Sequence, residues 1–225
     1  ALPLFEKLRA IGMTTRSACG HTVRNVVACP HGAITPEGLL DVTPWARRIT
    51  DYYIQRSALI NPTLPSRLNV FFSSCNECNT DAPFHDIAFV GVGVSTPGQN
   101  ESPRWGALKV VQAGSSATQA PAIGFEVWVG GSLGSRPMLG FKIRDFIPLE
   151  DALPACQAII EIHARYSDRA KNRSRRPDRA RLKYLIERWG REKFAAMFDQ
   201  LFLEKKSLPD NREVPLPAIG ESEPQ

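Results

Sequence analysis

Several kinds of segment are missing from this 225-residue sequence. No apolar run approaches the length of about 20 residues that a membrane-spanning helix needs. The opening stretch, A-L-P-L-F-E-K-L-R, does not follow the basic-then-apolar order of a secretory signal peptide. There is also no initiator methionine, so we expect the chain to be part of a longer protein.

Cysteine is scarce and odd in number, with five residues. An odd count without a secretory signal favours a reducing compartment over a disulfide framework, so we expect a cytoplasmic protein. Cys75 and Cys78 form one C-x-x-C, in F-F-S-S-C-N-E-C-N, and no second C-x-x-C matches it. The pair is therefore either half of a zinc or iron-sulfur site or two thiols near a strand end. Cys156 lies on the apolar face of a predicted helix and is expected in the core.

Common motifs for nucleotides and nucleic acids are missing too. The glycine-rich segment 130–137, G-G-S-L-G-S-R-P, is not a P-loop because no G-K-[ST] follows it. Such a loop does let the backbone approach a ligand closely. No helix-turn-helix or RNP signature appears, and no aromatic ladder is interleaved with the arginines.

Positive charge is concentrated in two places. Arg24 and Asn25 lie inside the β-branched run T-V-R-N-V-V, where they are costly to desolvate unless an anion compensates. In residues 165–191, basic residues far outnumber acidic ones. This segment can be a solvated helix face, a nucleic-acid surface or a binding site for an anionic cofactor. We favour the cofactor, because Arg179 and Lys183 are one helical turn apart and are expected to share a face.

Periodicity and turn residues predict an α+β layout, with strands early in the chain and helices late. Helices are expected at residues 4–11, 43–57, 148–164, 178–189 and 192–203, with Thr43 as an N-cap and Pro44 at the first helical position. Strands are expected at residues 22–28, 68–73, 86–94, 107–112 and 123–129, the last two paired with each other. One domain is expected over residues 1–206, and an extended tail over residues 207–225.

Five blocks of this sequence occur together, in order, in one known family. They are T-V-R-N-V-V-A-C-P, L-P-S-R-L-N-V, D-I-A-F-V, G-F-E-V-W-V-G-G-S-L-G and R-A-R-L-K-Y-L-I-E-R-W-G. In these blocks the chain resembles the first catalytic half of sirohaem-dependent nitrite and sulfite reductases, over about residues 8–202. The resemblance implies a mixed sheet carrying helices, with sirohaem between two homologous halves. It also implies six-electron reduction of nitrite to ammonia, or of sulfite to sulfide.

The resemblance implies roles for single residues. Arg24 matches the arginine that faces the substrate beside sirohaem. Arg67 stands where the family usually has lysine; it keeps the charge but cannot deliver a proton. Asn69 stands at the second anion-facing position, where asparagine is typical of ferredoxin-type nitrite reductases and favours nitrite. The residues expected to bind the cofactor are Asn25, Gly130, Gly131, Arg179, Arg181 and Lys183.

The resemblance implies a 4Fe–4S cluster as a second cofactor, with its ligands outside this chain. The family's ligands form a C-x₅-C and a later C-x₃-C in the second half, and neither spacing occurs here. The expected partners are nitrite or sulfite, the second half with a ferredoxin-like segment, and a donor such as ferredoxin, with no membrane and no nucleic acid. We therefore expect no turnover by this chain alone. A non-catalytic tetrapyrrole-binding homologue, the related cobalamin-pathway monooxygenase and a nucleic-acid-binding module remain as alternatives.

Overall fold

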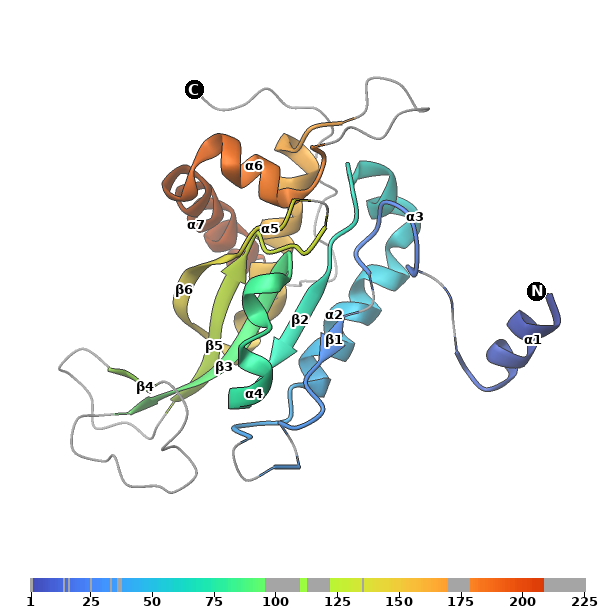
Figure 1. The fold of residues 1–225 in the computed structure, drawn as a ribbon, viewed down its shortest axis with the longest axis horizontal. Coiled ribbons are helices and arrows are strands. Elements are labelled where there is room, and N and C mark those ends of the chain that lie inside the picture. Colours follow the sequence, from blue (N-terminus) through green and yellow to red (C-terminus); the bar gives the residue numbers. More distant parts are fainter. Residues whose placement is uncertain are drawn as a thin grey trace.

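Strands from both halves of the chain form one mixed sheet at the centre of the molecule (Figure 1). The computed structural model describes residues 2–13, 15, 17–24, 26–32, 34–35, 38–95, 110–112, 122–134, 136–169 and 179–208. Its strands are β1 (Val27–Ala28), β2 (Val70–Ser73), β3 (Ile87–Ser95), β4 (Val110–Gln112), β5 (Ala122–Val129) and β6 (Phe141–Pro148). The sheet order is β1-β2-β3-β5-β6, and β4 pairs with β3. β1, β2, β3 and β4 pair in parallel, whereas β5 pairs antiparallel with both β3 and β6. The expected mixed sheet is therefore confirmed.

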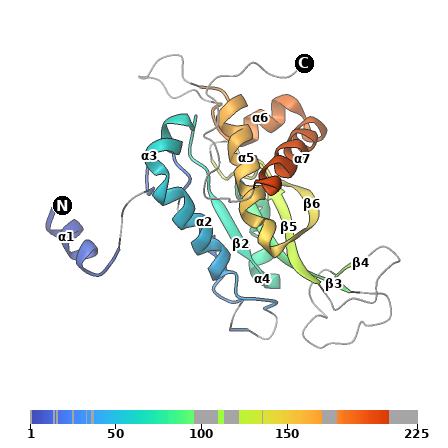
Figure 2. The ribbon, with the colours of Figure 1, turned by 180° about the vertical axis from the view of Figure 1, so that it is seen from behind.

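Helices lie against both faces of the sheet (Figure 1 and Figure 2). The helices are α1 (Leu2–Ala10), α2 (Thr43–Gln55), α3 (Ser57–Ile60), α4 (Asn76–Asn79), α5 (Ala152–Tyr166), α6 (Leu182–Trp189) and α7 (Arg191–Ser207). Short 3₁₀ helices are η1 (Asn61–Thr63), η2 (Ala82–Phe84) and η3 (Leu149–Asp151). Figure 2 shows α2 and α5 across one face, with α7 beside α5, while α4 lies on the other face in Figure 1. None of the described helices is long and apolar enough to cross a lipid bilayer.

The core joins the sheet to α2 and α5. Phe72 of β2 stacks on Phe89 of β3 with ring centroids 4.6 Å apart, and Phe125 of β5 meets both rings edge-on. Trp45 of α2 packs edge-on against Phe125 at 5.7 Å. Cys156 is fully buried in α5, as expected. Such aromatic packing contributes beyond the buried area alone, so it holds the central strands rigidly against the helices.

Two expectations at helix ends and strand pairs are wrong. Thr43 is the first helical residue rather than the N-cap; its N–H donates to the side chain of Asp41 at 2.9 Å, and Val42 occupies the cap position. Pro44 is therefore the second helical residue rather than the first. β4 pairs in parallel with β3 rather than with β5, because β5 uses its two edges for β3 and β6.

Strand lengths differ from the sequence prediction as well. The strand expected at residues 22–28 shortens to β1 and an isolated bridge between Val23 and Leu68. β6 was not predicted, because its alternation is broken by Arg144 and Asp145. Residues 209–225 lie outside the described part of the chain, so the boundary at residue 206 stays a prediction.

Candidate active site

Basic side chains converge where β1 and β2 begin. Arg24 precedes β1, and its backbone N–H donates to the carbonyl of Leu68 at 3.0 Å. Arg67 and Asn69 precede β2. Since β1 and β2 are parallel, their amino ends meet at one edge of the sheet. Residues more than 40 positions apart in the sequence are thereby brought together.

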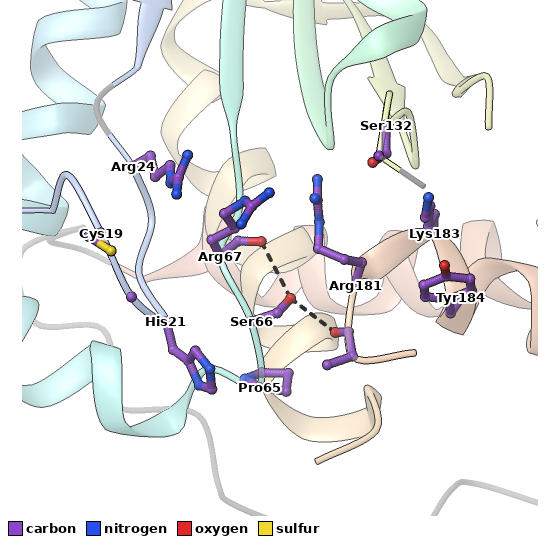
Figure 3. Close-up of a pocket in the computed structure, with 13 residues that line it drawn as sticks. Cys19, His21, Arg24, Pro65, Ser66, Arg67, Ser132, Arg181, Lys183 and Tyr184 are labelled. Carbon is purple, nitrogen blue, oxygen red and sulfur yellow. Dashed lines mark hydrogen bonds between the residues drawn. The ribbon is translucent and has the colours of Figure 1, made fainter. Parts of the chain in front are cut away.

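A cavity of about 360 Å³ lies at this edge (Figure 3). Its walls come from residues within segments 19–24, 65–67, 132–134 and 180–184. Arg24, Arg67 and Arg181 point toward the same space from three segments, and Lys183 lines it from α6 (Figure 3). Four of the predicted site residues therefore share one cavity. Such a concentration of cations is typical of a site for carboxylates or other anions.

A hydrogen-bonded hydroxyl holds two of these segments together. Ser66 donates from Oγ to the carbonyl of Ala180 at 3.0 Å, which ties the residue before Arg67 to the residue before Arg181 (Figure 3). The same oxygen lies 3.2 Å from Nε2 of His163 in α5, and Nδ1 of His163 lies 2.8 Å from the hydroxyl of Ser167. His163 is fully buried, and this burial lowers its pKa to about 3. The imidazole is therefore neutral at pH 7 and positions Ser66 without adding charge.

Arg181 is held by a buried carboxylate. Its guanidinium donates to both side-chain oxygens of Asp86, at 2.7 and 2.8 Å, and its Nε donates at 3.2 Å. Asp86 is fully buried and also accepts from the N–H of Asn69 at 2.9 Å. Burial raises the pKa of Asp86, and the guanidinium and the amide oppose that rise. The pair therefore fixes Arg181 and the start of β2 in one arrangement.

Two further cations lack full compensation by acidic groups. Lys183 is only 2% exposed, and its Nζ donates to the carbonyl of Arg136. Burial, together with the neighbouring Arg181 cation, lowers the pKa of Lys183. The Nε of Arg24 is buried and has no hydrogen-bond partner among the described residues. A buried donor without a partner costs free energy, so both cations favour an anionic ligand.

Other predicted site residues lie elsewhere. Asn69 lines a neighbouring cavity of about 510 Å³, which it shares with Arg24. Arg179 is exposed and lines neither cavity. Because α6 begins at Leu182, Arg179 and Lys183 do not share a helix face, and that prediction is wrong. Asn25 lies outside the described residues.

Gly130 and Gly131 shape the loop whose following residues line the cavity. Gly130 adopts a positive φ of 87°, and a Cβ on Gly131 would lie 2.1 Å from the carbonyl of Pro83 in η2. Both positions thus need glycine for backbone reasons. Ser132 and Gly134, which follow in the same loop, line the cavity in their place.

Most of the described basic residues downstream have partners within the protein. Arg165 pairs with Glu161, Arg188 donates to Asp168 at 2.5 Å, and Arg169 donates to the carbonyl of Thr63. Residues 170–178 lie outside the described part of the chain. Among the described residues, these internal contacts give Arg165, Arg169 and Arg188 a structural role.

The residues that orient the cations are not predicted from the sequence. Asp86 and Arg181 are 95 positions apart, and Ser66 and His163 are 97 apart. No local spacing links such residues. The one available signal was an acidic residue at the start of the apolar run D-I-A-F-V, which needs a cationic partner if buried.

Comparison with known proteins gives one family. The profile of the nitrite and sulphite reductase 4Fe-4S domain matches residues 19–206. A sulfite reductase [ferredoxin] 1 of Mycolicibacterium paratuberculosis is 27% identical over 208 residues, covering 91% of this chain and 31% of the relative. An assimilatory ferredoxin-dependent nitrite reductase of Haloferax mediterranei is 28% identical, covering 89% and 30%. The structure of the Mycobacterium tuberculosis NirA protein matches 99% of this chain and 33% of its own, with a TM-score of 0.65 and 24% identity, and shows the same fold.

These matches confirm the resemblance inferred from the sequence blocks. The chain spans about a third of the length of the reductases it matches. The family implies sirohaem and a 4Fe–4S cluster as the cofactors of such enzymes. This chain belongs to the nitrite and sulphite reductase 4Fe-4S domain family.

Proposed function

We propose that this chain supplies the sirohaem- and anion-binding wall of a reductase that converts nitrite to ammonia or sulfite to sulfide. The observation that carries the proposal is the convergence of Arg24, Arg67, Arg181 and Lys183 on one cavity. An acid-bearing macrocycle and a small oxyanion both need fixed positive charge. Family membership supports this assignment.

The surface beside the cavity suits a macrocycle as well as its carboxylates. Val27, Phe84 and Leu133 are exposed apolar residues, and they line the neighbouring cavity with Arg24 and Asn69. A flat apolar ring with acidic substituents would bury this apolar surface and pair with the cations. The expected roles of Asn25, Gly130, Gly131 and Arg179 belong to the same proposal.

The chain's own part in the chemistry is electrostatic. Sirohaem, when bound, supplies the iron chemistry of the six-electron reduction. Arg24 and Arg67 would attract the anion and stabilise negative charge as its bonds break. Arginine does not release a proton at working pH, so Arg67 can hold the anion but cannot protonate it. Asn69 lines the neighbouring cavity together with Arg24. An asparagine at this position favours nitrite as the substrate.

Turnover also requires an electron source and the second half of the active site. The 4Fe–4S cluster, a ferredoxin donor and the second catalytic half are parts of the proposal, supported by relatives named as ferredoxin-dependent reductases. A cytoplasmic location is proposed on the same grounds.

Binding of sirohaem tests the proposal directly. The full chain, produced with a sirohaem supply, should show isobacteriochlorin absorbance, and Lys183→Met should weaken sirohaem binding by about tenfold to a hundredfold, because a charge-assisted contact is lost. An iron porphyrin without carboxylates should bind both proteins alike. Arg48→Met, which removes an exposed charge on α2, serves as the matched control.

Nitrite binding tests the anion site separately. Arg24→Met should weaken the nitrite-induced spectral change of the sirohaem-loaded chain by about tenfold or more. The proposal fails if no isobacteriochlorin is retained, or if Arg24→Met and Arg48→Met bind nitrite equally well.

A further inference from the structure

Three thiols and one imidazole meet at the carboxyl ends of β1 and β2, whereas the arginine-lined cavity lies at their amino ends. Cys29 and His31 follow β1, Cys75 follows β2, and Cys78 lies in α4. Their ligand atoms all lie within 4.8 Å of one another. Sγ of Cys29 is 3.3 Å from Sγ of Cys75, and Sγ of Cys78 is 3.9 Å from Nδ1 of His31. The C-x-x-C is thus completed by the C-x-H of Cys29 and His31, which no sequence spacing connects to it.

The donor set matches a closed mononuclear metal site. Three thiolates and one imidazole are a known tetrahedral ligand set for structural zinc. With Zn–S near 2.3 Å and Zn–N near 2.0–2.1 Å, a tetrahedron places its ligand atoms about 3.5–3.8 Å apart. The two measured separations, 3.3 and 3.9 Å, lie on either side of this range.

Burial and hydrogen bonding also favour a metal. Cys29 and Cys75 are each 3% exposed, whereas Cys78 and His31 are half-buried and leave a path for an ion. The N–H of Cys78 approaches Sγ of Cys75 at 3.4 Å, in the orientation that supports a metal-bound thiolate. All of these cysteines are free thiols, so no disulfide competes for them.

A 4Fe–4S cluster does not fit these residues. Such a cluster is held by four cysteine thiolates with iron and sulfide atoms between them. Here one of the four ligands is a histidine, and the ligand atoms lie too close together to surround several metal atoms. The spacing in the chain also differs from the C-x₅-C and C-x₃-C pairs of the family.

The position of the cluster gives the metal a structural task. β1 has only two residues and pairs with β2 at only two positions, Val27 with Phe71 and Ala28 with Phe72. So short a ladder holds a strand weakly. A metal bound directly after it would cross-link β1 to β2 and so fix Arg24, at the other end of β1, against Arg67.

We propose that Cys29, His31, Cys75 and Cys78 bind one structural zinc ion that joins the carboxyl ends of β1 and β2. The site lies at the opposite strand ends from the arginine-lined cavity, and it does not depend on sirohaem or on the proposed reaction.

Metal analysis of the untagged full chain tests the site. Elemental analysis should find about one zinc per chain and no acid-labile sulfide. Cys78→Ser should bring the zinc content close to zero, whereas His31→Cys, which restores a fourth thiolate, should retain it. Cys19→Ser is the matched control, because Cys19 is an exposed thiol outside the cluster.

Cobalt substitution gives an independent readout that needs no variant to fold. The wild-type chain loaded with Co²⁺ should show the intense visible bands of tetrahedral cobalt with thiolate ligands. A chain without metal, a zinc content equal in Cys78→Ser and Cys19→Ser, iron with matching acid-labile sulfide, or only weak octahedral cobalt bands would each overturn the proposal.

Discussion

Replacement of Arg181 with methionine is expected to lower the free energy of unfolding by about 3–5 kcal/mol. The substitution leaves Asp86 as a fully buried carboxylate. This carboxylate has lost two short hydrogen bonds from the guanidinium and keeps one from an amide. An uncompensated buried charge is costly, whereas methionine preserves most of the apolar volume of the arginine stem. Urea denaturation at pH 7 measures the change.

Arg188, in the helix α6 that follows Arg181, serves as the control. Arg188 donates to Asp168 at 2.5 Å, but their side chains are 37% and 47% exposed. Exposed ion pairs contribute little, so Arg188→Met should cost less than about 1 kcal/mol. Adding Asp86→Asn to Arg181→Met should recover part of the loss, because the buried charge is removed. Equal losses for Arg181→Met and Arg188→Met would contradict the role assigned to the buried pair.

The second large effect is acid sensitivity from His163. Its pKa is about 3 in the folded protein and about 6.5 in an unfolded chain, so the unfolded state takes up a proton first as the pH falls. The stabilisation is complete above pH 6.5 and is lost progressively toward pH 3. Between pH 7 and pH 5, His163 alone should lower the free energy of unfolding by about 2 kcal/mol.

Denaturation at pH 7, 6 and 5 checks this slope. His163→Gln keeps a polar side chain but cannot titrate, so it should flatten the pH dependence even if its stability at pH 7 is lower. Arg181, Arg169 and His21 face His163 and oppose its protonation. His85, whose pKa burial also lowers, acts in the same direction, so His85→Gln should remove only a smaller share. An unchanged slope in His163→Gln would rule out this assignment.

Much of the candidate site follows from the sequence because its cations lie in distinctive local contexts. Arg24 interrupts a β-branched run, and Arg181 and Lys183 belong to a densely basic segment, so each could be identified without knowing its neighbours. Arg179 could not be placed correctly, because its role depended on where α6 begins. A helix end is decided by packing and caps over one or two residues, which periodicity does not resolve.

The sequence by itself determined the family, the α+β class with its main strands and helices, and the residue types of the candidate site, because short motifs and periodicity are local properties of a chain. Only the tertiary structure decided which of these residues meet. Cys29 and His31 join the C-x-x-C because the parallel strands β1 and β2 bring their carboxyl ends together across more than 40 residues of sequence. Asp86 meets Arg181 because the segment before α6 packs against the start of β3, 95 residues away in the sequence. Sheet order and register depend on the packing of the whole chain, so no single segment encodes them.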